Sequence, residues 1–303
     1  MNKKKSSQGE SNENGKWSRM VLRRMSFAWR PRMPAHWNLA RPEFSQLVNA
    51  GSLAMPYLEP YLIKTMREAR PLITDPELVR ALDLYCAQES THFRQHRNFN
   101  DRLKTFGIHA IEPIEARLEQ DYETLGRTKS LTFNLAYAEG FESMALAIGH
   151  MLIKDREFLF AGSDTAVASL ILWHFIEEIE HKSVAFDVFQ HISGNYFWRI
   201  YGLAYATGHI FARSRSNYQA LLKEDGLWRN LRSRLALARL LLRIFSKLIP
   251  GMLPILSPRY HPAKVGDPPW ALAWSALFEA DAAGAARIDT NRLASAIPQA
   301  LPS

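Results

Sequence analysis

The sequence predicts an all-α protein, a four-helix bundle with additional C-terminal helices. Apolar residues recur at helical spacing along most of the 303-residue chain, and no stretch shows the strict alternation of a half-buried strand. Two Glu-x-x-His pairs, Glu89/His92 and Glu178/His181, each lie inside a long helical stretch. Such pairs on two helices, with one Glu from each of two others, hold two metal ions in known bundles. The pattern therefore indicates both a fold and a metal site.

Start and stop signals define the four main helices. The residues Asp-Pro-Glu at 75–77 combine an N-cap, a proline in the first turn and an acid, and Gly107 ends the helix that they begin. Ser163-Asp164 caps the last of the four, and Gly194 follows its end. We expect these helices at residues 56–70, 75–106, 129–153 and 163–192, with shorter helical segments at 44–54 and 113–125.

The chain changes character after Gly194. Residues 196–222 are apolar and aromatic, and residues 227–249 form a basic amphipathic helix whose cations fall largely in one narrow sector. A run of prolines from Pro250 to Pro258 then ends helical structure, and an Ala-rich segment at 269–283 folds back on the body. We therefore divide the chain into a disordered basic segment (1–33), a metal-binding helical bundle (34–225), and a basic helix with a C-terminal helical extension that packs on the bundle (226–303).

Composition and charge limit the possible functions. The net charge of +8 is concentrated near the start of the chain and at residues 229–247, while the centre is comparatively acidic. This argues against a nucleic-acid-binding protein, whose basic charge should gather at its working site. The single cysteine, Cys86, excludes an internal disulfide and fits a reducing, cytoplasmic compartment. No apolar run reaches the roughly 18 residues that a membrane-spanning helix needs.

Each of the four main helices offers candidate metal ligands. On the fourth, His174, Glu178 and His181 form one stripe at i, i+4 and i+7, which would be costly to bury among its apolar neighbours without a partner. Four carboxylates balance the charge of two divalent ions, and carboxylate with imidazole suits Fe, with Mn as the alternative. Taken helix by helix, the expected ligands are Glu59; Glu89 and His92; Glu139; and His174, Glu178 and His181.

The choice on the third helix is open between two acids. Glu142 follows Glu139 by three residues on nearly the same face, so it is the direct rival for the ligand position. Glu177 and Glu180 are expected to point away from the stripe, toward solvent or a basic side chain. Ligands also need partners that orient them through hydrogen bonds. The residues expected in that role are His96, Asn100, Glu142 and Asp187.

Three segments carry a resemblance to a known family. Residues 56–59 (PYLE), residues 88–92 (QESTH) with His96 and Asn100, and residues 173–189 (WHFIEEIEHKSVAFDVF) resemble the bacterial predicted metal-dependent hydrolases, over about residues 35–265. The ligand pattern is similar to that of ferritin-like di-iron oxygenases such as p-aminobenzoate N-oxygenase. The resemblance implies a ferritin-like bundle and two metals. It also implies the ligand set Glu59, Glu89, His92, Glu139, His174, Glu178 and His181.

Three functions are compatible with such a site. The first is a di-iron or Mn/Fe enzyme that activates O2 and oxidises a small, hydrophobic molecule. The alternative is a two-metal hydrolase, as the family name implies. The third is a non-catalytic metal store or structural site, which we rank last because it would not need the extra imidazole of His174. The sequence does not reveal the substrate.

The basic helix at 227–249 predicts a further contact. A basic helix with an apolar face can lie in the headgroup region of an anionic membrane, which would place the enzyme at the inner face of the cytoplasmic membrane. The alternative is that its leucines pack on the bundle and its arginines are solvated. A homodimer is the other partner that the sequence leaves open.

Overall fold

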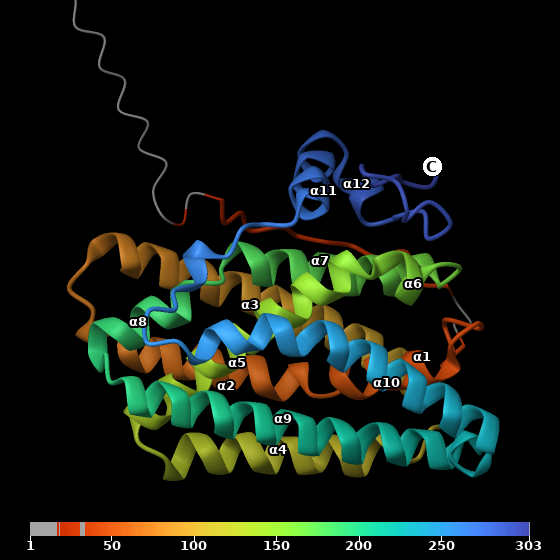
Figure 1. Ribbon diagram of the computed structural model, residues 1–303, viewed down its shortest axis with the longest axis horizontal. Helices are drawn as coiled ribbons and strands as arrows, with labels where there is room; N and C mark the ends of the chain where they lie inside the picture. Colours follow the sequence, from red (N-terminus) through yellow and green to blue (C-terminus); the bar gives the residue numbers. More distant parts are fainter. Residues whose placement is uncertain (1–16, 18, 31–33, 303) are drawn as a thin grey trace, which may run out of the picture.

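The structure, a computed structural model, describes residue 17 and residues 19–30 and 34–302 (Figure 1). Within these residues the chain forms helices and loops, apart from one isolated bridge between Ile288 and Ala300. The prediction of an all-α protein is confirmed, and the arrangement is consistent with a ferritin-like bundle. None of the helices in the described part of the chain is long and apolar enough to cross a membrane.

Four helices surround the candidate site: α2 (Met55–Ala69), α3 (Pro76–Lys104), α5 (Leu131–Lys154) and α7 (Thr165–Glu180). Their starts follow from local sequence, because the side chains of Asp75, Ser130 and Asp164 accept hydrogen bonds from first-turn amides of α3, α5 and α7. The shorter helices α1 (Pro42–Ser52), α4 (Ile111–Thr128) and α6 (Arg156–Phe160) connect and flank these four.

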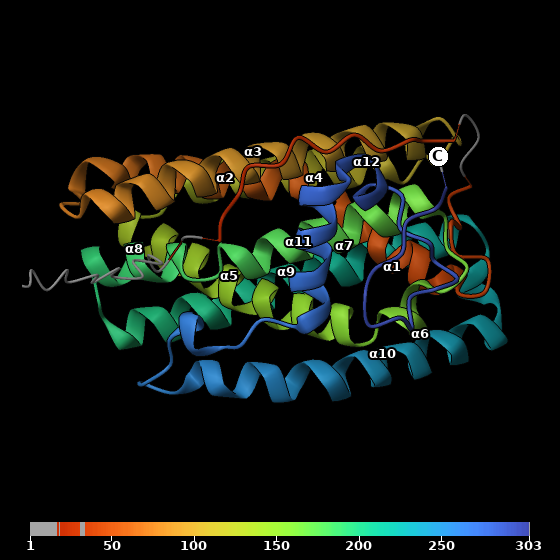
Figure 2. The same ribbon diagram turned by 90° about the horizontal axis from the view of Figure 1, so that it is seen from above.

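Helix α5 is buried on nearly every side, because α9 (Tyr196–Glu224) packs along its outer face. Two glycines make this contact close. A Cβ on Gly140 would lie 2.5 Å from Leu203 Cα, and a Cβ on Gly202 would overlap the Ala136 carbonyl. The apolar segment that follows Gly194 is therefore a long helix that packs closely on α5 (Figure 2).

The fourth predicted helix is divided in two. α7 ends at Glu180, His181 leaves the helical conformation with ψ of 8°, and α8 runs over Val184–Ile192. The prediction of one helix to residue 192 is therefore wrong. No glycine or proline marks the break. A contact with a distant segment stabilises the break, since Lys182 Nζ donates to Asp267 Oδ1 at 2.6 Å.

The N-terminal segment is ordered where the structure describes it. Residues 20–30 run extended along the bundle, over α3 and α7 (Figure 2), with Met20, Arg23 and Phe27 buried. Disorder was predicted for residues 1–33, whereas in the described part of this segment Arg23 pairs with acidic residues of α7. Residues 1–16 and 31–33 lie outside the described residues.

Three helices complete the chain. α10 (Leu231–Met252) lies along the outer edge of the molecule (Figure 2), and α11 (Pro269–Ala280) and α12 (Ala282–Ala285) pack above α7 (Figure 1). The prediction that Pro250 ends this helix is wrong, because α10 continues two residues beyond Pro250, to Met252.

Candidate metal centre

Seven acidic and imidazole side chains converge between the four helices. Each is at most 3% exposed. They are Glu59 of α2, Glu89 and His92 of α3, Glu142 of α5, His174 and Glu178 of α7, and His181 at the break that follows α7. The break after Glu180 leaves the ring of His181 inside the cluster, against Glu178 and Glu142.

One group of ligand atoms gathers around His181. Its Nε2 lies 3.2 Å from Glu178 Oε2, 3.3 Å from Glu142 Oε2 and 3.4 Å from Glu89 Oε1. One atom from each of these four residues lies within 4.8 Å of the others. Three carboxylate oxygens and one imidazole nitrogen at this separation can hold one divalent cation.

A second group lies beside the first. His174 Nε2 is 3.2 Å from Glu178 Oε1, and His92 Nδ1 is 3.4 Å from Glu89 Oε1. Glu59 joins Glu89 and His92 in one set of converging atoms, and His174 and Glu178 join His92 in another. Glu89 and Glu178 belong to both groups, so both carboxylates would help to hold a cation bound in either group.

The hydrogen bonds of these side chains test whether metal ions fit. Both oxygens of Glu59 and of Glu89, one oxygen each of Glu142 and Glu178, and His92 Nδ1 have no hydrogen-bond partner among the described residues. Carboxylate oxygens that are buried without a hydrogen bond are costly, since they lose the hydrogen bonds that water would give them. Cations between the two groups would supply the missing partners, so the residues present fit a pair of divalent metals.

The pKa values reflect the same crowding. Burial and the charge of Glu178 raise the pKa of Glu142 to about 8. Burial and the charge of Glu89 raise the pKa of Glu59 well above its ordinary value. Burial would also raise the pKa of Glu178, but the adjacent His181 and His174 outweigh it and hold that pKa well below the usual range. Without metal the cluster therefore retains protons that cations must displace.

His92 is oriented by an acid that the sequence analysis assigned elsewhere. Its Nε2 lies 2.9 Å from Glu177 Oε2, and Glu177 in turn accepts a hydrogen bond from Arg23 at 3.1 Å. Donation from Nε2 leaves Nδ1 free to face the cluster. Glu177 does pair with a basic residue, as expected, but it is fully buried and contacts a candidate ligand. Arg23 was missed because 154 residues separate it from Glu177 in sequence.

His174 is held by a chain of polar groups. Its Nδ1 lies 2.9 Å from His96 Nε2, and His96 Nδ1 lies 2.8 Å from Ser52 Oγ. Because the Ser52 hydroxyl donates to Asn100 Oδ1, its oxygen accepts from His96 Nδ1. His96 Nε2 then accepts from His174 Nδ1, which leaves His174 Nε2 with a free lone pair toward the cluster. The structure thus brings His96 and Asn100 to the positions expected for orienting residues.

Two further orienting residues were not predicted. The Tyr85 hydroxyl donates to Glu142 Oε1 at 2.6 Å, and Gln88 Oε1 lies 3.3 Å from His181 Nδ1. Gln88 also donates to the carbonyl of Val21 in the N-terminal segment. Gln88 immediately precedes Glu89 on α3, but its sequence position alone does not distinguish it from a solvated glutamine.

Two expected residues lie elsewhere. Glu139 is buried, but its oxygen accepts from Ser143 at 3.0 Å and lies 3.8 Å from Arg199 of α9, and it belongs to none of the converging groups. On α5, the structure therefore places Glu142 rather than Glu139 among the converging side chains. Asp187 lies 3.1 Å from His261 Nε2 and belongs to none of those groups.

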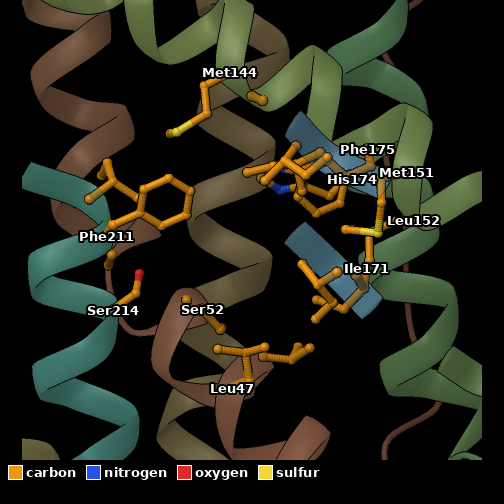
Figure 3. Close-up of a pocket in the computed structure, with 18 of the residues that line it drawn as sticks. Leu47, Ser52, Met144, Met151, Leu152, Ile171, His174, Phe175, Phe211 and Ser214 are labelled. Carbon is orange, nitrogen blue, oxygen red and sulfur yellow. The ribbon is translucent and has the colours of Figure 1, made fainter. Parts of the chain in front are cut away.

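An apolar cavity reaches the cluster. It has a volume of about 230 Å³ and lies between α1, α5, α7, α9 and α10. Figure 3 shows His174 on one wall and Phe211 and Ser214 of α9 on the opposite wall. Among the lining side chains only Ser52, His96, His174 and Ser214 carry polar atoms, and none is acidic, lysine or arginine.

Comparison with known proteins gives one match. A family model described as "Predicted metal-dependent hydrolase" matches residues 21–266, which include every member of the cluster. No curated protein and no solved structure matches the chain.

Proposed function

Because the chain belongs to the predicted metal-dependent hydrolase family, we propose that the buried cluster is the active centre of an enzyme that uses two divalent metal ions. The observation that carries this proposal is the set of four carboxylates and three imidazoles, several of whose inward atoms have no hydrogen-bond partner among the described residues. Four negative charges balance two divalent ions. Iron is the proposed metal, with manganese as the alternative, since both accept carboxylate and imidazole donors.

The proposed reaction is O2-dependent oxidation of a small molecule. Two bound iron ions would supply redox chemistry with O2 or, in the alternative reaction, Lewis acidity for hydrolysis. The position of His174 supports a reaction at the inner end of the cavity, because this side chain both lines the cavity and contacts Glu178 of the cluster. Those walls limit water near the centre, which suits the protection of a reactive site. The family's description favours the hydrolytic alternative.

The surrounding residues hold protons at defined atoms. His96 accepts the proton of His174 Nδ1, which fixes the ring of His174 toward the cluster. Tyr85 keeps its hydroxyl proton, because burial and the charge of Glu142 raise its pKa well above the ordinary value. Its O–H therefore remains a donor to Glu142 and a neutral neighbour of the centre.

The cavity supports an apolar substrate. A charged group placed among its walls would lose water without gaining an ionic partner. A hydrocarbon chain or ring would instead bury apolar surface on both sides. The part of the substrate that enters the cavity is therefore proposed to be uncharged and hydrophobic.

Anaerobic reduction of the iron-loaded protein followed by addition of O2 separates the two reactions. Oxidation predicts stoichiometric O2 consumption with a change in the optical spectrum. The hydrolytic alternative predicts no O2 consumption and turnover of ester or phosphoester probes under anaerobic conditions. Metal-loaded protein that shows neither response would refute an enzymatic role in either class.

A further inference from the structure

The outward face of α10 carries a continuous apolar stripe. Its members are between 36% and 79% exposed, with Phe245 the least and Leu231 the most exposed. At 3.6 residues per turn they fall within a sector of about 80° that follows the whole helix. We call this stripe the α10 ridge; it consists of Leu231, Leu235, Leu242, Phe245 and Ile249.

The ridge is separate from the face by which α10 packs on the bundle. Leu237, Leu240, Ile244 and Leu248 are buried and form that face. A helix on the surface of a globular protein normally has polar residues opposite its packed stripe. In α10 the opposite side is apolar as well. The leucines of the ridge are therefore exposed rather than packed on the bundle.

Cations flank the ridge on an acid-free helix. No Asp or Glu occurs in α10. Arg243 and Lys247 pair with Asp155, whereas the guanidinium groups of Arg232 and Arg239 have no hydrogen-bond or ion-pair partner among the described residues. These two arginines lie together along one side of the ridge, where they can reach a negative surface in contact with it.

The ridge also adjoins the apolar cavity. Phe245 belongs to the ridge and lines the cavity, and its ring centroid lies 5.6 Å from that of Phe211 on the opposing α9. Leu241 and Ser214 line the same part and are partly exposed. A surface that covers the ridge would therefore lie next to the outer end of the cavity.

We propose that the α10 ridge docks the protein on the surface of an anionic lipid bilayer, with the ridge in the headgroup region and Arg232 and Arg239 against lipid phosphates. An apolar stripe of this length with basic residues beside it matches the chemistry of such a surface. A second copy of this chain is the poorer occupant, because its α10 would bring more cations and no acids. The docking does not depend on the metal centre, so it can fail without affecting the proposed function.

Co-sedimentation of the full chain with vesicles tests the docking. We expect binding to phosphatidylglycerol-containing vesicles at low ionic strength, weaker binding at high salt, and little binding to pure phosphatidylcholine. The variant Leu235→Asp/Leu242→Asp should abolish binding. The variant Arg232→Gln/Arg239→Gln should weaken it roughly 30-fold, the loss expected for two cations near an anionic surface.

Matched controls come from exposed residues elsewhere on the chain. Leu39→Asp/Leu72→Asp and Arg80→Gln/Arg127→Gln make the same chemical changes away from α10 and should bind vesicles as the unmodified protein does. Circular dichroism checks that each variant is folded. Absence of binding to anionic vesicles overturns the proposal, as does equal loss in the ridge and control variants. A dimer in solution that Leu235→Asp/Leu242→Asp dissociates, without vesicle binding, would assign the ridge to a second copy instead.

Discussion

Replacing Glu142 with glutamine should remove metal from the centre. Glu142 contributes one of four negative charges, so the substitution leaves a net charge of +1 on a cluster with two divalent ions. Unit charges about 4 Å apart interact by about 4 kcal/mol at an effective dielectric constant near 20, equivalent to roughly three orders of magnitude in affinity. The amide oxygen can still coordinate and recovers part of this. We therefore expect metal affinity to fall by at least about 100-fold.

Without metal, the same substitution should have little effect on stability. Burial and Glu178 raise the pKa of Glu142 to about 8, so at neutral pH the metal-free side chain is already neutral. Glutamine matches it in size and charge, and the free energy of unfolding without metal should barely change. Thermal unfolding with and without added iron, together with elemental analysis after reconstitution, measures both effects.

Glu139→Gln is the matched control for this experiment. Glu139 is equally buried on the same helix, but it contacts Ser143 and Arg199 rather than the cluster. This variant should keep its metal. Full metal content in Glu142→Gln, or its loss in Glu139→Gln, would refute the assignment of Glu142 and restore Glu139 as the ligand.

Four further outcomes are expected. His174→Ala should retain part of its metal through the other six ligands but change the optical spectrum and the activity, and a variant indistinguishable from the unmodified protein would make His174 a core histidine. Arg23→Met should destabilise the protein by about 3–5 kcal/mol in urea unfolding, because Glu177 and Glu180 lose the buried guanidinium that pairs with both, and an unchanged midpoint would contradict this. The pKa of Glu142 is raised from 4.5 to about 8 in the folded protein, so between these pH values the native state binds more protons than the unfolded state. The stability of the metal-free protein should therefore fall as the pH rises through this range. Metal binding near neutral pH should release protons measurable with an indicator dye, and binding without release would argue against displacement from Glu142 and Glu59.

Helical periodicity and capping residues predicted the main helices closely, because those signals are local. Asp75 and Asp164 cap their helices as expected. The break at His181 has no local signal, since it depends on contacts such as that of Lys182 with Asp267. The contacts of residues 20–30 with the bundle were not predicted for a related reason, because the buried partners of Arg23 come together with it only in the folded protein.

The candidate site was predictable where spacing on one helix decides which side chains share a face. The two Glu-x-x-His pairs and His174 illustrate this. The choice between Glu139 and Glu142 could not be predicted in this way, because α9 covers the back of α5 and both acids are buried. Which of them faces the cluster depends on the rotation of α5 about its axis, and the close contact at Gly140 and Gly202 constrains how α5 packs against α9. The roles of Glu177 and Gln88 likewise depend on contacts between distant segments.

The most direct test of the metal centre is the metal content of the purified chain. Elemental analysis after anaerobic reconstitution with iron or manganese should give about two ions per chain. Neither Glu178→Ala nor His181→Ala should reach that content, since Glu178 belongs to both ligand groups and His181 supplies the imidazole of one. Well under one ion per chain in the unmodified protein, or unchanged content in both variants, would contradict a dinuclear centre at these residues.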